Sequence, residues 1–198
     1  LLALHAERGV EVRAGVGVAA VLGDAHVTGV RLDDGAELPA DAVLVAIGSE
    51  PNVEWLHGSG LTLADGVVCD EHCVAAPGVY AAGDVARWHH AGLGRDLRVE
   101  HRQNAADQGR AVARHILGER VPFTPVPFFW TDHFGVKVQL AGTIPPGAEE
   151  EVLEDDAERG RLVVAFTVAG ATAGVVGWNA PDRVTAHRRE LAARAVAA

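Results

Sequence analysis

The amino-acid sequence predicts an α/β fold followed by a smaller α+β domain. One observation is the continuous apolar run Asp41–Gly48, which is typical of a parallel strand covered on both faces. A second is the helical spacing of apolar residues within Glu100–Leu117, soon after a short apolar strand. A third is the change of composition at Pro122, beyond which segments of alternating polarity predict antiparallel strands. At 198 residues, with 48% hydrophobic and 22% charged residues, the chain has a globular composition and room for one large or two small domains.

The first 48 residues predict a helix end and several strands. Leu1–Arg8 has the pattern of an amphipathic helix without a cap ahead of it, so we expect the chain to begin inside a domain. Gly9–Arg13 predicts a strand after a glycine stop. Val16–Leu22 and His26–Leu32 predict a strand pair joined by a turn.

Gly15–Ala20 matches the Gly-x-Gly-x-x-Ala form of a dinucleotide-binding fingerprint, which has to open a helix. Turns follow at Gly23-Asp24 and at Asp33–Gly35, too close together for a crossover helix. The strand interpretation is therefore favoured.

The middle of the chain carries the candidate site. Gly66–Asp70 predicts a short strand, and Gly78–Ala82 predicts a buried strand that ends in small residues. Gly83 allows a ligand to approach the backbone, and the carboxylate of Asp84, just past the strand, can accept hydrogen bonds from the hydroxyls of a polyol.

The helix predicted over Glu100–Leu117 has an unusually small packing face and ends at Gly118. It can therefore lie close to the sheet, with its amino end aimed at whatever Asp84 holds. Free N–H groups there would stabilise negative charge on an electron-rich ring. The predicted face consists of Ala105, Gly109, Val112, Ala113 and Ile116.

The last segment begins with a proline-rich connector, Val121–Pro127, and the aromatic run Phe128–Trp130. Glu149–Glu158 holds seven acidic residues in ten positions and is expected to be a solvated loop. The predicted elements are strands at Val136–Ala141, Arg161–Val168 and Thr172–Trp178 and a terminal helix at Pro181–Ala198.

An ordered set of motifs carries a family resemblance through almost the whole chain. These are Val79–Ala86, Arg98–His101, Asn104-Ala105, Gln108–Arg110 and Pro127–Asp132. The set resembles the FAD-dependent NAD(P)H:ferredoxin reductases, of the ferredoxin/rubredoxin reductase type, in the pyridine nucleotide-disulphide oxidoreductase superfamily.

The resemblance implies partial Rossmann-like FAD- and NAD(P)-binding domains followed by a small α+β reductase domain. Residues 1–48 would be the C-terminal part of the NAD(P)H-binding domain, 49–121 the returning segment of the FAD-binding domain, and 122–198 the C-terminal reductase domain.

The resemblance also implies cofactor contacts, with no catalytic side chain and no metal. The aspartate at position 84 would hydrogen-bond the ribityl chain of FAD, and the helix would point at the pyrimidine end of the flavin. Arg102 stands where family members usually have tryptophan, and adds a fixed positive charge. Trp130 would either line the flavin and nicotinamide site or be a core tryptophan. The implied contacts are Gly83, Asp84, Val85, His101, Arg102, Ala105 and Trp130.

The implied chemistry is hydride transfer from NAD(P)H to FAD, then single-electron transfers to a ferredoxin-type iron–sulfur protein. Both glycine fingerprints and the first FAD-binding segment are missing from the sequence. We therefore expect the chain to be a C-terminal portion of a reductase that binds FAD weakly by itself. The protein is also expected to be cytoplasmic. Alternatives are another FAD/NADH oxidoreductase of the superfamily, such as a nitrite-reductase subunit or a cell-death-type NADH oxidase, and a non-catalytic interaction module.

Charge and composition restrict the partners. The net charge of −10 argues against a nucleic-acid surface, and no stretch reaches the roughly 18 apolar residues of a membrane span. Cys69 and Cys73 are spaced unlike a redox pair and are expected to be incidental buried thiols. His89, His90 and His101 lack the companions of a metal site.

Arginines crowd the region of the candidate site and offer a docking rim for an acidic electron carrier, with Arg95 and Arg98 the best candidates. The competing interpretation is that they form internal salt bridges. The set is Arg87, Arg95, Arg98, Arg102, Arg110, Arg114 and Arg120.

Overall fold

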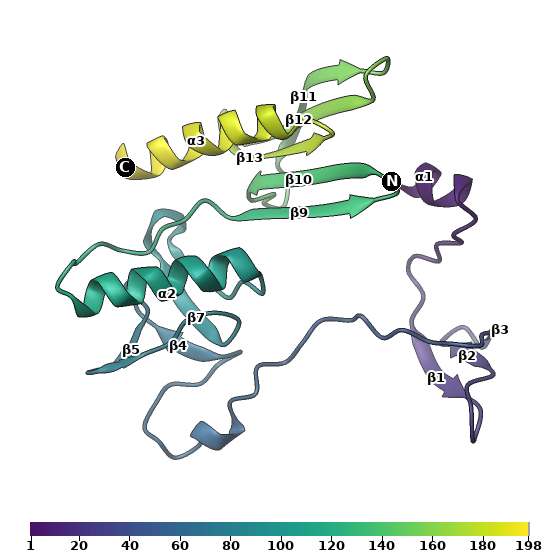
Figure 1. The fold of residues 1–198 in the computed structure, drawn as a ribbon, viewed down its shortest axis with the longest axis horizontal. Helices are drawn as coiled ribbons and strands as arrows, with labels where there is room; N and C mark the ends of the chain where they lie inside the picture. The colour runs from purple at the N-terminus through teal and green to yellow at the C-terminus, as the bar shows by residue number, and fades with distance from the viewer. Residues whose placement is uncertain (198) are drawn as a thin grey trace. The chain divides into compact units, whose positions relative to one another are not determined.

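The structure is a computed structural model that describes residues 1–197, with side chains to residue 194, and it divides into two compact units, Leu1–Ser49 and Glu50–Ala198. Figure 1 shows the elements of both units along the chain. No helix in the described part of the chain is long and apolar enough to cross a membrane.

The first unit contains a short helix and an antiparallel three-stranded sheet. The helix α1 spans Leu2–Glu7, and the sheet has the order β1-β2-β3. The predicted strand pair is confirmed, because β1 (Val18–Leu22) pairs with β2 (Gly29–Leu32), and β3 (Glu37–Pro39) adds to β2. The glycine fingerprint therefore opens a strand and not a helix.

Two predicted strands of this unit were wrong. Residues 9–13 and 41–48 have no strand structure. The side chains of Leu44 and Ile47 are 91% and 89% exposed. A parallel strand needs neighbouring strands for its backbone hydrogen bonds and for cover on both faces. The described chain pairs no strand with either segment, so apolar character alone does not make them strands.

The first part of the second unit packs small sheets around a buried tryptophan. The strand β7 (Ala86–His90) lies between β4 (Val67–Cys69), which is parallel to it, and β8 (Arg95–Leu97), which is antiparallel. Trp88 is fully buried and its indole N–H donates to the Phe123 carbonyl (3.0 Å). The remaining elements are β5 (Val74–Ala76) paired with β6 (Val79–Tyr80), and the 3-10 turns η1 (Glu54–Leu56) and η2 (Ala91–Leu93). The strand predicted before Asp84 is thus confirmed but shorter.

The helix α2 (Arg102–Ile116) confirms the predicted helix, and Gly118 follows its end at φ +101°. Its predicted packing face was correct at Ala105 and Val112, which are half-buried with Val112 packed against the core, and wrong at the other three positions. Gly109, Ala113 and Ile116 are exposed, and the residues buried on this helix are the polar Gln108 and His115. Apolar spacing missed this face because both polar side chains have partners inside the protein.

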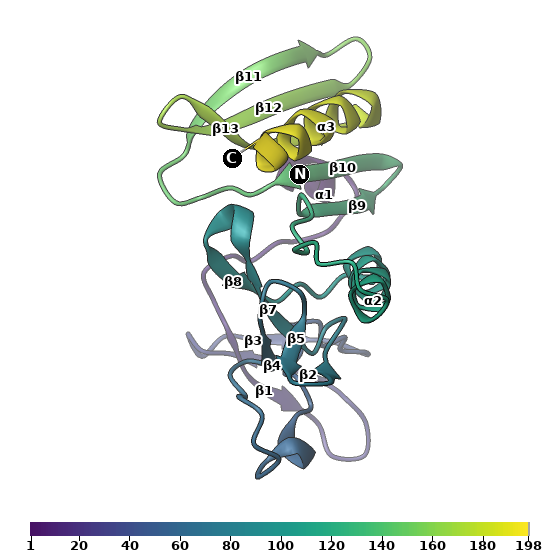
Figure 2. The same cartoon turned by 90° about the vertical axis from the view of Figure 1, so that its left-hand side faces the viewer.

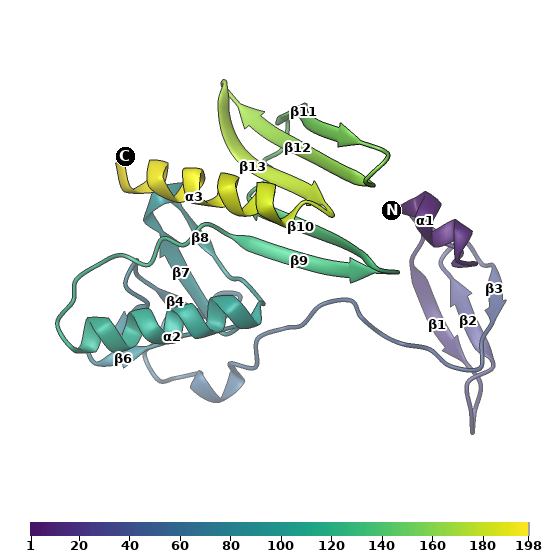
Figure 3. The same cartoon turned by 45° about the horizontal axis from the view of Figure 1, so that its top comes forward.

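The last part is an antiparallel five-stranded sheet of order β11-β12-β13-β10-β9, with α3 (Pro181–Ala197) packed against β10 and β13. Figures 1 and 3 both show α3 lying along this sheet. The predicted strands and terminal helix are confirmed, with residue 198 outside the described residues. The strands are β9 (Phe128–His133), β10 (Val136–Gly142), β11 (Glu149–Asp156), β12 (Arg161–Val168) and β13 (Ala171–Trp178).

The acidic segment was predicted incorrectly as a loop. Glu149–Asp156 forms β11, which pairs only with β12 and is an edge of the sheet. Its acidic side chains are compatible with a strand because four of the six are exposed to water, and the half-buried Glu154 and Asp156 form ion pairs with arginines. Like charges along an exposed edge also disfavour pairing with another chain.

Candidate functional site

The candidate site is built on the loop 81–85, which connects β6 to β7. Gly83 is buried at φ +84°, and its N–H donates to the side-chain oxygen of Gln108 (2.8 Å). A methyl group on Gly83 would lie 3.4 Å from the Cβ of Ala105, so α2 packs close against the loop. The loop conformation is therefore set by a glycine and by a buried side chain 25 positions further along the chain.

Asp84 follows on the exposed side of the same loop. Its carboxylate has no hydrogen bond or ion pair within the described residues, and its backbone carbonyl accepts from the Arg98 guanidinium (3.2 Å). The Val85 carbonyl accepts from the Val67 N–H (2.8 Å). The backbone around Asp84 is fixed on both sides, and its carboxylate remains available to a ligand.

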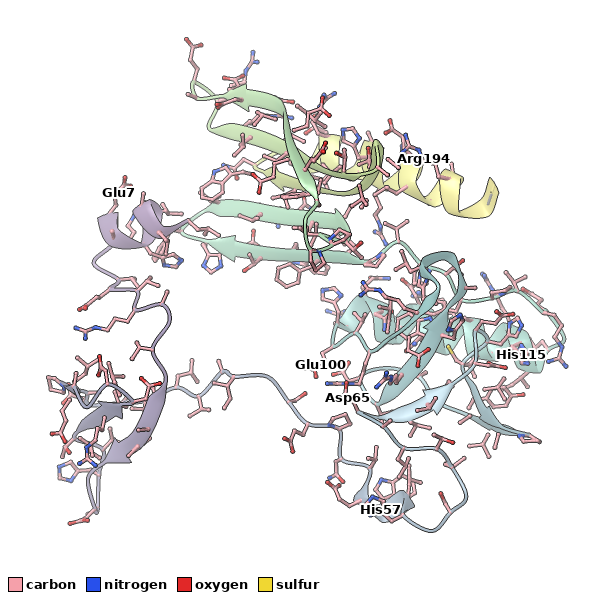
Figure 4. The ribbon with its side chains drawn as sticks, turned by 180° about the vertical axis from the view of Figure 1, so that it is seen from behind. Glu7, His57, Asp65, Glu100, His115 and Arg194 are labelled. Atoms are coloured by element: carbon pink, nitrogen blue, oxygen red, sulfur yellow. The ribbon has the colours of Figure 1, made fainter. Side chains whose placement is uncertain are left out.

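Arg98 is held by two carboxylates. Its guanidinium lies 3.0 Å from Asp65 and 2.5 Å from Glu100, and its side chain is only 14% exposed. Figure 4 shows Asp65 and Glu100 beside each other. These hydrogen bonds raise the pKa of Arg98 above its ordinary value, so the positive charge of this clamp is permanent. Arg98 thus has a structural role at the site, as the salt-bridge interpretation predicted, and of the two candidates for a surface role only Arg95 is exposed.

The amino end of α2 carries three of the predicted residues. His101 is the N-cap, and its Nδ1 accepts from the Gln103 N–H (3.3 Å). Arg102 is exposed and forms no ion pair among the residues described, and Ala105 is half-buried against Gly83. The cap satisfies one of the free N–H groups at this end of the helix. The positive end of the helix dipole and the permanent positive charge of Arg102 therefore lie together here.

Trp130 on β9 joins the last sheet to this helix end. Its ring meets His101 edge-on, with 4.6 Å between ring centroids, and Phe128 lies at 5.7 Å. The indole is 39% exposed, so Trp130 is not a core tryptophan. Trp130 contacts the cap of α2, whereas Gly83 contacts its first turn at Ala105, so this turn is what brings the predicted residues together.

Gln108 was quoted in the sequence motifs without any role. It is fully buried, and its amide nitrogen has no hydrogen-bond partner among the described residues. Its side chain slightly opposes the rise in the pKa of the Cys73 thiol that burial causes. The available indication was its position three residues after Ala105 and four before Val112, in the middle of an apolar face. A polar side chain there has to satisfy a buried group.

The two cysteines and three histidines have separate surroundings. Burial raises the pKa of the Cys69 thiol to about 11 and that of Cys73 to about 12, which disfavours reactive thiolates. His89 contacts Asp96 (3.1 Å), His90 is buried and bonds to the Pro125 carbonyl (2.9 Å), and His101 caps α2. His90 therefore belongs to the interior and is not a solvated loop side chain.

Of the seven arginines, Arg120 contacts the imidazole of His115, and the other six divide into two groups. Arg87, Arg98 and Arg110 pair with carboxylates of the same unit, as the salt-bridge interpretation predicted. Arg95, Arg102 and Arg114 are exposed and have no ion pair in the part of the chain that the structure describes. The candidate rim is therefore smaller than the sequence suggested.

The arrangement has a definite chemical character. A free carboxylate can accept hydrogen bonds from hydroxyl groups, the buried glycine leaves room for a close approach, and the amino end of α2 favours negative charge. A ligand with a polyol chain attached to an electron-rich ring fits this donor and acceptor set.

Comparison with known families divides the chain in two. Residues 1–109 match the family described as pyridine nucleotide-disulphide oxidoreductase, and residues 128–198 match a family described as reductase C-terminal.

Individual relatives of the chain are described as ferredoxin reductase subunits or components. A 5,5'-dehydrodivanillate O-demethylase ferredoxin reductase subunit from Sphingobium sp. is 40% identical over 164 residues, which cover 81% of this chain and 40% of the relative. The ferredoxin reductase component of a chlorobenzene dioxygenase from Cupriavidus sp. is 37% identical over 196 residues, which cover 98% and 47%.

Solved structures agree on the fold. A ferredoxin reductase for the CYP199A2 system from Rhodopseudomonas palustris has a TM-score of 0.84 at 34% identity, over 91% of this chain and 45% of that one. The covalent putidaredoxin reductase–putidaredoxin complex has a TM-score of 0.85 at 29% identity, over 94% and 46%. The chain thus spans somewhat less than half the length of the relatives that it matches.

Proposed function

This chain belongs to the pyridine nucleotide-disulphide oxidoreductase family and carries its reductase C-terminal domain, and from this premise we propose that it is the carboxy-terminal part of an FAD-dependent NAD(P)H:ferredoxin reductase. Residues 1–48 would then complete the NAD(P)H-binding domain, 49–121 the FAD-binding domain, and 122–198 would form the reductase domain. The observation that carries the proposal is the unpartnered carboxylate of Asp84 on a fixed loop beside the amino end of α2. Relatives described as ferredoxin reductases, together with the match over residues 128–198, favour this function over a nitrite-reductase subunit or an NADH oxidase.

In this proposal the residues of the chain bind and orient the cofactor. Asp84 accepts hydrogen bonds from the ribityl hydroxyls, and Gly83 and Ala105 allow the backbone to come close. The amino end of α2 and the cation of Arg102 stabilise negative charge on the ring. Trp130 packs at the nicotinamide side and keeps water away. Bound FAD supplies hydride and single-electron chemistry to this site.

The test uses Asp84→Ala in the complete flavoprotein. Loss of charge-assisted hydrogen bonds to the ribityl chain should weaken FAD binding by about 1–3 kcal/mol, measured by flavin fluorescence during titration of the apoprotein. The Tm of the apoprotein should not change, because the Asp84 side chain is exposed and forms no hydrogen bond or ion pair among the described residues. Asp155→Ala, at an exposed and unpartnered aspartate of β11, is the matched control. FAD affinity that is the same in both variants would refute the assignment.

We further propose that the electron acceptor is a ferredoxin-type protein with an acidic surface. Arg95 is exposed at the start of β8 and has no ion pair among the described residues, so its field is not neutralised locally. In the complete protein, Arg95→Glu should slow ferredoxin reduction at low ionic strength. Arg189→Glu, which reverses an exposed charge on α3, should not do so, and equal rates in the two variants would exclude this surface.

A further inference from the structure

A cavity separate from the candidate cofactor site lies where the first part of the second unit meets its last domain. Its volume is about 300 Å³, within the range of small-molecule sites. None of the seven residues assigned to the cofactor lines it. Figures 1 and 2 both show the tip of the β7–β8 hairpin reaching the last domain beside α3, and Leu93 of this tip and Leu191 of α3 both line the cavity. Val126 of the connector adds to the apolar lining.

The walls of the cavity are preformed. His90 is only 3% exposed and uses both ring nitrogens in the wall itself. Its Nδ1 accepts from the Leu93 N–H (3.2 Å), so its Nε2–H is the donor to the Pro125 carbonyl (2.9 Å). This neutral histidine ties the hairpin tip to the connector. A ligand therefore does not have to order these segments when it binds.

The polar groups of the cavity are few and unpartnered. Thr124, Thr143 and Thr172 line it, and their hydroxyls have no hydrogen-bond partner in the described chain. Arg194, on α3, also lines it and forms no ion pair with any described residue (Figure 4). No carboxylate is among the lining residues in the described structure. One uncompensated cation, three hydroxyls and apolar walls define the ligand chemistry.

We propose that this cavity binds a small monocarboxylate with an apolar body. The carboxylate would pair with Arg194 and accept from the threonine hydroxyls, while the body fills the space between Leu93, Val126 and Leu191. A phosphate or a dicarboxylate would bring more negative charge than the single guanidinium can neutralise, together with a heavily hydrated group that the apolar walls cannot replace. A neutral ligand would leave the guanidinium without a partner.

The test titrates the chain with sodium 2-naphthoate and, separately, with the neutral isostere 2-naphthamide. Binding is followed by amide chemical shifts of the isotopically labelled protein. We expect saturable shifts at Leu93, Thr124, Val126, Thr143 and Thr172, and binding of the carboxylate about tenfold tighter than that of the amide. Arg194→Gln should weaken naphthoate about tenfold and leave naphthamide unchanged. Arg189→Gln, at an exposed arginine of the same helix that does not line the cavity, should change neither.

A second variant tests whether the ligand binds in this cavity, without changing any charge. Ala171 is an exposed lining residue, so Ala171→Trp should obstruct the cavity without disturbing the core and should weaken both ligands. The proposal is overturned if naphthoate gives no saturable shifts up to about 10 mM, a weak-binding limit. It is also overturned if the shifts map outside the lining, or if Arg194→Gln and Arg189→Gln behave alike. Because no cofactor is involved, these outcomes do not depend on whether the proposed reductase function holds.

Discussion

The side-chain oxygen of Gln108 accepts from the buried N–H of Gly83, and no other described group satisfies that N–H. Gln108→Leu keeps the volume but leaves the N–H without a partner inside the protein. We expect the free energy of unfolding to fall by about 1–3 kcal/mol, measured by urea denaturation.

Gln103→Leu is the matched control on the same helix. The Gln103 side chain is exposed and bonds only to Asp107 among the described residues, so its replacement should change the free energy of unfolding by less than about 0.5 kcal/mol. Equal losses in the two variants would show that Gln108 is no more important to the loop than a surface residue.

His115 is expected to make the stability of the second unit depend on pH. Its side chain is 6% exposed. Burial lowers the pKa of its imidazole most, and the interactions with the positively charged Arg120 and with the neighbouring His72 lower it further, while Asp70 raises it. Arg120 also donates to its Nε2, and Tyr80 packs against its ring. Below about pH 6.5 the imidazole of His115 is therefore protonated more readily in the unfolded chain than in the folded chain.

Stability should consequently decrease as the pH falls from about 7.5 to 5.5, across the ordinary histidine pKa. In His115→Gln the slope of unfolding free energy against pH should be smaller over this interval. In His57→Gln, at an exposed histidine, it should be unchanged. The same slope in all three proteins would contradict the role of His115. Urea denaturation at several pH values measures it.

At the scale of elements, the packing of α3 on its sheet depends on the absence of a side chain at Gly177. A methyl group there would lie 2.3 Å from Cγ2 of Val184, which is 1% exposed and cannot move into water. Gly177→Ala should therefore lower the free energy of unfolding by about 1–3 kcal/mol, because the helix has to shift.

The same substitution on α2 should have the opposite sign. Gly109 is exposed in the helix interior, and a methyl group there has nothing within 4 Å. Gly109→Ala should raise the free energy of unfolding by about 0.5–1 kcal/mol through helix propensity. Destabilisation by Gly109→Ala, or none by Gly177→Ala, would contradict the described packing; thermal denaturation of both variants decides.

At the scale of the molecule, order is unevenly distributed. The five-stranded sheet has a continuous ladder and a buried cluster that includes Val163 and Val175, whereas the apolar segment 41–48 has no strand partner in the described chain. We expect the amides of β12 and β13 to exchange slowly with deuterium in the isolated chain, and those of residues 43–47 to exchange rapidly. Slow exchange at 43–47, measured by mass spectrometry, would mean that another chain covers this segment.

Local patterns predicted much of the fold. The strand pair β1–β2, the strands β12 and β13, and both long helices each follow from a run of residues whose spacing matches one element. At the site, the sequence alone indicated a glycine, a carboxylate and a helix end close together, because Gly83 and Asp84 are adjacent and the small packing face of the helix allows it to lie close to the sheet. Packing then placed Ala105 against Gly83 and Trp130 against His101.

The amino-acid sequence therefore specifies local features, namely periodicity, turns and the order of motifs that places the chain in its family. Which strands pair and which side chains form hydrogen bonds or ion pairs depends on how the chain packs in three dimensions. Residues 41–48 are apolar enough for a strand but find no neighbour, and the acidic residues of β11 form one because β12 pairs with them. Arg98 reaches back to Asp65, and Gln108 to Gly83, across 33 and 25 positions. Hydrogen bonds and ion pairs of this kind depend on which groups meet in space, and no spacing along the chain records that meeting.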